Sequence, residues 1–129
     1  MASYLLDTTV IVNYLRGKPA TVRLVKRISA EGSSLGCCPI NIIEVCAGTL
    51  DKEKEATQQF LDSLEYYELT KESAMRAGEY KQYYQKKGTT LSLPDVAIAA
   101  IAIANDLALL TDNPKHYPMT ELNVQAANG

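Results

Sequence analysis

Ser3-Tyr4-Leu5-Leu6-Asp7-Thr8 near the start of the chain decides the fold. A short apolar run that ends at an acid is typical of a strand buried on both faces of a parallel sheet. We expect similar buried strands over Leu35–Cys38 and Leu107–Leu110, a strand over Tyr66–Leu69 and a weaker one near Val124.

Segments with apolar residues at helical spacing separate these strands and predict helices. The expected helices span Thr8–Leu15, Pro19–Ser29, Ile40–Leu50, Lys52–Leu64, Lys71–Lys87 and Leu93–Asn105. Strands that alternate with helices predict an α/β fold with a mostly parallel central sheet flanked by helices. The length of 129 residues predicts that 1–129 form a single domain.

Composition excludes several classes of protein. The chain is 47% hydrophobic and 22% charged, with a formal net charge of −2, so it does not bind nucleic acid by bulk positive charge. We expect Cys37, Cys38 and Cys46 to be buried free thiols in a reducing compartment. The N-terminus lacks a basic lead, and the apolar run Val96–Ala104 is too short to cross a bilayer, which favours a cytoplasmic protein without a membrane partner.

Four acids follow strands or begin helices: Asp7, Glu44, Asp95 and Asp112. Ligands of parallel sheets bind beyond the carboxyl ends of the strands, so these positions are candidate site residues. Each also has an ordinary explanation. Asp7 is a good helix cap, Asp95 suits the first turn of a helix, and Asp112 suits an Asp-Asn-Pro turn.

Glu44 and Asp95 are harder to explain as caps or turns. Glu44 shares a predicted helix face with Ile40 and Ala47, and no Lys or Arg occurs between residues 27 and 52. Asp95 precedes a helix that is apolar on every side. Carboxylates that converge without basic partners repel each other, and Mg²⁺ or Mn²⁺ relieves that repulsion. Such a cation suits phosphodiester hydrolysis, because it polarises the phosphoryl oxygen and activates a water.

Small polar residues lie next to these acids or one helical turn away: Thr8, Asn41, Thr111 and Asn113. They are candidates for orienting the metal ligands or a water molecule. Capping and turn formation explain the same residues equally well.

The segments Leu5–Thr8, Ile40–Val45, Leu93–Ala100 and Leu109–Asn113 resemble those of PIN domains, and their size and order resemble the VapC toxins of toxin–antitoxin pairs. The resemblance covers nearly the whole chain. It implies a three-layer PIN-like domain and a Mg²⁺- or Mn²⁺-dependent endoribonuclease that cleaves RNA. It also implies a homodimer and a cognate VapB-like antitoxin whose C-terminal segment occupies the active-site groove.

Within the resemblance, Asp7, Glu44 and Asp95 match the main catalytic and metal-binding acids. Many relatives carry Thr-Arg-Asn and a further Asp where this chain has Thr111-Asp112-Asn113 and then His116. Two alternatives follow. Asp112 supplies the fourth catalytic, metal-binding carboxylate, or the site has three acids assisted by Asn113. His116 is more typical of a surface loop than of a base or ligand.

Arg16 and Lys18 are candidate RNA contacts because they closely follow the first predicted helix. They begin a run of cations that continues through Arg23, Lys26 and Arg27 without an acid, which is also typical of a solvated helix face. A second hypothesis for function is a non-catalytic PIN-like module that binds RNA or protein. Mn²⁺ binding that depends on Asp7 would contradict it.

Overall fold

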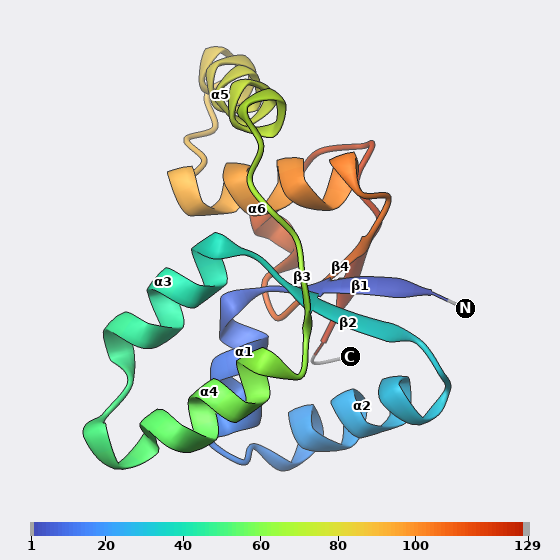
Figure 1. Cartoon of the computed structure of the whole chain (residues 1–129). Helices are drawn as coiled ribbons and strands as arrows, with labels where there is room; N and C mark the ends of the chain where they lie inside the picture. Colours follow the sequence, from blue (N-terminus) through green and yellow to red (C-terminus); the bar gives the residue numbers. More distant parts are fainter. Residues whose placement is uncertain (1, 128–129) are drawn as a thin grey trace.

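A parallel sheet of five strands lies at the centre of the molecule (Figure 1). The computed structural model describes residues 2–127. The strands are β1 (Ser3–Leu6), β2 (Ser34–Cys37), β3 (Glu65–Tyr66), β4 (Ala108–Thr111) and β5 (Val124–Ala126). Their order is β3-β2-β1-β4-β5, and every pairing is parallel, which confirms the predicted parallel sheet.

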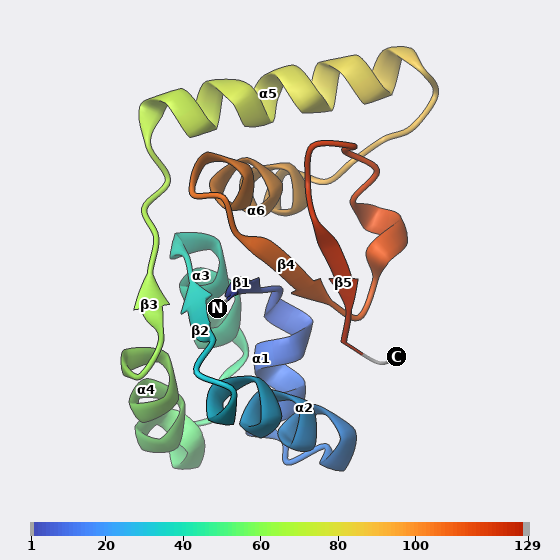
Figure 2. The same cartoon turned by 90° about the vertical axis from the view of Figure 1, so that its right-hand side faces the viewer.

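Helices cover both faces of the sheet and complete three layers (Figures 1 and 2). Their bounds are α1 (Thr8–Leu15), α2 (Pro19–Ala30), α3 (Pro39–Gly48), α4 (Lys54–Asp62), α5 (Lys71–Lys86) and α6 (Leu93–Ala104). Helix α6 lies on one face with α5 outside it, whereas α1, α2 and α4 lie on the other side (Figure 2). The α/β class predicted from the sequence is confirmed.

Alternation along the strands builds two cores. Leu5 of β1 packs with the buried α6 residues, and Leu6 packs with Val10 and Ile11 of α1 on the opposite face. A strand with apolar side chains on both faces must lie inside a sheet, which explains the central position of β1.

Several bounds differ by one or two residues from the sequence prediction, as for β2, which was expected over Leu35–Cys38. Three other differences follow. The predicted helix Lys52–Leu64 is divided into a 3₁₀ turn, η1 (Asp51–Glu53), and α4. Strand β3 is an edge strand of two residues, because its register with β2 pairs only Glu65 and Tyr66. Strand β4 is shifted by one residue and so includes Thr111, whose side chain is completely buried.

The cysteine prediction is confirmed for two thiols and wrong for the third. Cys37 and Cys38 are buried at the end of β2, but Cys46 is exposed on α3. The buried side of α3 passes through Asn41 and Val45, which leaves Cys46 on the solvent side. In residues 2–127, the helices all fall short of the length and apolar character that a bilayer crossing demands.

Candidate active site

Asp7 lies at the carboxyl end of the central strand and begins α1. Its side chain is 7% exposed and is fixed by two donors. The Thr8 N–H donates to Oδ1 at 2.8 Å, and the Thr111 hydroxyl donates to Oδ2 at 2.6 Å. Asp7 therefore caps α1, as its ordinary explanation predicts, while its carboxylate lies at the edge where a parallel sheet binds ligands.

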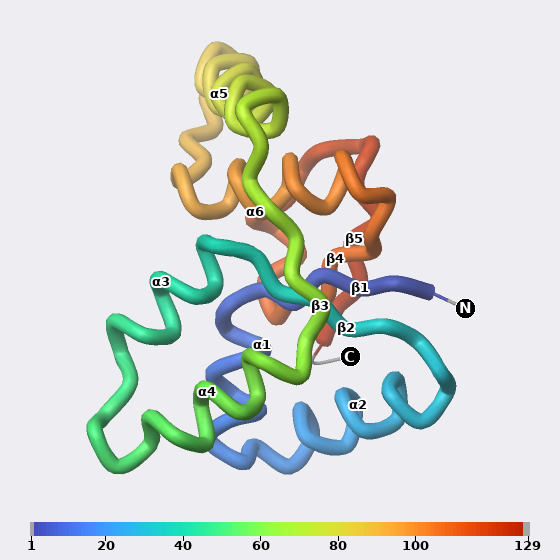
Figure 3. Tube along the Cα trace, viewed as in Figure 1, coloured from blue at the N-terminus to red at the C-terminus, as the bar shows by residue number. Residues whose placement is uncertain are grey.

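Thr111 joins two neighbouring strands at this edge. Strand β4 pairs directly with β1, although their residues lie at opposite ends of the chain (Figure 3). The Thr111 hydroxyl accepts the Asn113 N–H at 3.0 Å, so its own hydrogen is directed toward Asp7. Asn113 thus contributes to the site through its backbone, and its side chain is exposed.

Glu44 reaches the site through Thr8. The Thr8 hydroxyl donates to Glu44 Oε1 at 2.7 Å and accepts a hydrogen bond from Asn41 Nδ2 at 3.0 Å. Asn41 is fully buried, and its Oδ1 accepts the Cys38 N–H at 2.9 Å, which fixes the start of α3. The helix face that Glu44 shares with Ile40 and Ala47 is not the buried one. Glu44 is exposed, since the buried stripe of α3 runs through Asn41 and Val45.

Asp95 lies in the first turn of α6, where the helix dipole favours an anion. The Ser92 hydroxyl caps this helix by accepting the Asp95 N–H at 3.2 Å. The helix is buried from Val96 to Ala102, but the Asp95 side chain is 22% exposed and faces the open edge. Asp95 is therefore accessible to a ligand from its position in the first turn of α6.

Tyr117 connects Asp95 with Asp7, and the sequence pattern did not predict this role. Its side chain is 3% exposed, and its hydroxyl donates to Asp95 Oδ1 at 3.2 Å. Burial, followed by the charges of Asp7 and Asp95, raises the pKa of Tyr117 far above its usual range, and the hydrogen bond to Asp95 adds to this effect. The phenol thus remains a neutral donor between two carboxylates.

His116, next to Tyr117, is on the rim of the site. Its Nδ1 lies 3.5 Å from Asp95 Oδ2, and its side chain is 57% exposed. A side chain of a different kind from the expected fourth acid thus faces the Asp95 carboxylate at this position.

Asp112 has a different hydrogen-bond partner from the other three acids. Its Oδ2 accepts a hydrogen bond from Asn13 Nδ2 of α1 at 2.9 Å. It lines a hollow of about 400 Å³ together with Arg16, Lys18 and Asn113. Arg16 and Lys18, the two predicted RNA contacts, therefore lie beside Asp112. Thr8 lines the same hollow.

The donor set fits a hydrated magnesium-type cation. In the part of the chain that the structure describes, no three His, Cys, Asp or Glu side chains form a ready-made metal cage. Asp7, Glu44 and Asp95 form no ion pair with Lys or Arg among residues 2–127, so their charge is uncompensated apart from the His116 contact. Mg²⁺ is often bound by one or two carboxylates and several waters, which is what Asp7 and Asp95 offer.

Comparison with protein families gives a match to the PIN domain model over residues 4–121. Among curated proteins, Ribonuclease VapC19 of Mycobacterium tuberculosis is 31% identical over 115 residues, covering 89% of this chain and 92% of that protein. Ribonuclease VapC10 of the same organism is 30% identical over 117 residues, covering 91% of this chain and 87% of that protein.

Solved structures share the fold over almost the full length. The DNA-bound VapBC complex of Salmonella typhimurium contains a chain that matches with a TM-score of 0.85 and 21% identity, covering 98% of this chain and 99% of that one. VapBC2 of Rickettsia felis, bound to a promoter DNA fragment, matches with a TM-score of 0.82 and 22% identity, covering 96% and 98%.

Proposed function

The chain belongs to the PIN domain family, and on that premise we propose that it is a divalent-metal-dependent endoribonuclease, the toxin of a toxin–antitoxin pair. The observation that carries the proposal is that Asp7 and Asp95 both act on one buried phenol, Tyr117, at the ligand-binding edge of a parallel sheet. The ribonuclease names of the curated relatives support the choice of RNA as substrate.

Asp7 and Asp95 would hold the cation, which we propose to be Mg²⁺ or Mn²⁺. When bound, such a cation polarises a phosphoryl oxygen and lowers the pKa of a bound water. The chain's own groups orient the ligands: Thr111 and the Thr8 N–H fix Asp7, and Tyr117 fixes one oxygen of Asp95. Groups that orient ligands in this way typically change metal affinity by about 10–100-fold when removed.

Glu44 and Asp112 have different parts in this proposal. Glu44 is tied to Thr8 and exposed beside Asp7, so it is suited to position a water or a second hydrated cation. Asp112 is bonded to Asn13, and we propose that it acts through the position of α1, with Asn113 assisting the three other acids. Arg16 and Lys18 lie in the hollow beside it and are suited to contact RNA phosphates.

We also propose that the chain forms a homodimer and binds a VapB-like antitoxin. The VapBC complexes among the structural matches support this partner. Large apolar side chains that remain exposed on α3, on the segment after it and on α6 also support it, because exposed apolar surface marks association sites. These are Ile43 (66% exposed), Leu50 (57%) and Leu93 (68%).

Cleavage of a mixed RNA pool tests the proposed activity. The purified chain should cut RNA with Mg²⁺ or Mn²⁺ and should stop with EDTA. Asp95→Asn removes one charge and little volume, so it should fold and lose cleavage. Asp51→Asn is the matched control, because Asp51 is exposed and its ion-pair partner is Lys54, which is not a site residue.

Full cleavage by folded Asp95→Asn would refute the site assignment. A wild-type chain that neither cuts RNA nor binds Mn²⁺ in calorimetry would favour the non-catalytic binding module instead.

A further inference from the structure

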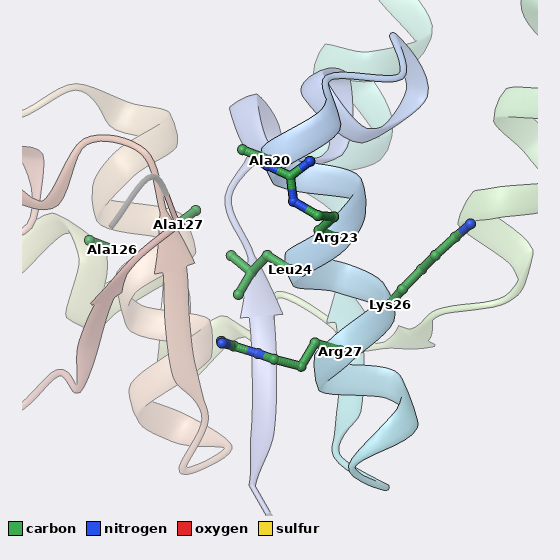
Figure 4. A pocket seen from close by; sticks show the side chains of 7 residues that line it. All are labelled: Ala20, Arg23, Leu24, Lys26, Arg27, Ala126 and Ala127. Carbon is green, nitrogen blue, oxygen red and sulfur yellow. The ribbon is translucent and has the colours of Figure 1, made fainter.

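A groove between α2 and the end of β5 is separate from the acidic site and has a volume of about 820 Å³ (Figure 4). One wall is α2, and the other is formed by Ala126 and Ala127. Arg27 extends from α2 toward the strand that carries the two alanines, whereas Lys26 points to the opposite side of the helix (Figure 4). The groove thus has a cationic wall facing a wall of small side chains.

The cations of this wall are largely free of acidic partners. Within residues 2–127, Arg23 forms no ion pair, and Arg27 contacts only Glu31, at 3.5 Å with both side chains more than 60% exposed. An exposed pair of this kind contributes little to stability, so Arg27 remains available to another anion. The chain carries no acid between Asp7 and Glu31, and this face is therefore positive on a protein whose net charge is −2.

The arginines have the spacing of a repeating anion. Arg23 and Arg27 are one helical turn apart, which corresponds to a rise of about 6 Å. That separation is comparable to the distance between successive phosphates of an extended nucleic-acid strand. Guanidinium groups bind phosphate oxygens in a bidentate manner, and the small side chains opposite leave room for a backbone.

The groove opens on the edge of the sheet that carries Asp7. Ala126 pairs in register with Thr111, and the Ala127 N–H donates to the Thr111 carbonyl at 2.8 Å. Thr111 in turn donates to Asp7. Because neighbouring strands are about 4.8 Å apart, the end of the groove lies within about two strand spacings of the Asp7 strand.

We propose that this groove binds the backbone of single-stranded RNA on one side of the bond that is cut, with Arg23 and Arg27 each contacting a phosphate. The inference rests on the proposed ribonuclease function and extends its substrate contacts beyond Arg16 and Lys18. An acidic peptide suits the groove less well. Apolar anchors usually supply most of the affinity for a peptide, and Leu24 is the one large apolar side chain lining this part of the described structure.

The test measures RNA binding by the Asp95→Asn protein, which should bind without cutting. Arg23→Gln combined with Arg27→Gln should weaken binding of a long single-stranded RNA by about tenfold near physiological salt. The slope of log K against log salt should decrease by about 1.4, since about 0.7 is lost for each single-strand phosphate contact. The control is Lys54→Gln combined with Arg76→Gln, which removes the same charge from α4 and α5.

Cleavage kinetics give an independent readout. When the groove substitutions are made in the protein that retains Asp95, KM for long RNA should rise while kcat stays unchanged. A short oligonucleotide that cannot reach the groove should be cut as well by this variant as by the wild type. Equal binding and cutting by the groove and control variants, with an active wild type, would overturn the inference. A groove variant that binds RNA like the wild type but no longer binds polyglutamate, a model acidic peptide, would also overturn it. An inactive wild-type chain would instead refute the proposed ribonuclease function.

Discussion

Replacing Tyr117 with Phe removes one hydroxyl group from between two carboxylates and changes little else in the buried packing. In the structure that hydroxyl donates to Asp95 Oδ1 at 3.2 Å, and the charge of Asp7 also acts on it. A hydrogen bond to a charged group contributes about 1.5–3 kcal/mol to stability. Water can reach Asp95, whose side chain is 22% exposed, so we expect the lower end, about 1.5 kcal/mol.

Two measurements follow from this value. Without metal, Tyr117→Phe should lower the melting temperature by about 6 °C for a chain of this size. In calorimetry, Mn²⁺ should bind about tenfold more weakly, because the carboxylates lose the donor that orients them toward a cation.

Tyr84→Phe is the matched control for this variant. The Tyr84 hydroxyl also makes a 3.2 Å hydrogen bond, but its acceptor is the Pro118 carbonyl and not a carboxylate of the site. Its removal should leave Mn²⁺ affinity unchanged. If Tyr117→Phe binds Mn²⁺ as tightly as the wild type, or more tightly, then the phenol does not orient the carboxylates and the reasoning is refuted.

Three further predictions concern the site and the residues that support it. Asn41→Ala should destabilise the fold by about 3 kcal/mol in urea titration, because it leaves the buried Cys38 N–H without an acceptor; a loss below about 1 kcal/mol would contradict this. Mn²⁺ at about 100 times its dissociation constant should stabilise the wild type by about 2.7 kcal/mol and leave the melting temperature of Asp7→Asn unchanged. Equal increases in the melting temperatures of the two proteins would show that Asp7 does not bind the metal. Burial raises the pKa of Cys37 from 9.0 to about 11, so the contribution of this thiol to stability is fully present below pH 9 and is lost as the pH rises toward 11. Cys37→Ala should therefore lose less stability than the wild type over that interval. Parallel curves of stability against pH for the two proteins would argue against the shift.

The fold could be predicted from the sequence largely because its strands are short, apolar and followed by acids. Ser3–Leu6 and Thr8–Leu15 are observed with the predicted bounds, and Asp7 lies where a parallel sheet places ligand-binding groups. The strand near Val124 has a weak sequence signal, but it is observed as β5, which pairs in parallel with β4.

The site was harder to predict, because its connections depend on tertiary contacts. Glu44 is exposed because α3 is apolar nearly all around, so the sequence does not indicate which stripe is buried; the bond from Asn41 to Cys38 selects it. Tyr117 reaches Asp95 across 22 positions and after a 3₁₀ turn, a relation without a repeating sequence signal. Asp112 follows β4 directly but is bonded to Asn13 on a different element.

The hydrogen bond between Thr111 and Asp7 joins residues 104 positions apart, and this separation has a consequence for synthesis in the cell. A growing chain emerges N-terminus first, so β1 and Asp7 are made long before β4 and Tyr117 are available. Until β4 pairs with β1, Asp7 lacks the Thr111 donor, and Asp95 lacks the phenol. An incomplete chain therefore contains most of the acids but not their arrangement, and a ribosome making this chain is not exposed to the arranged acids until β4 and Tyr117 have been made.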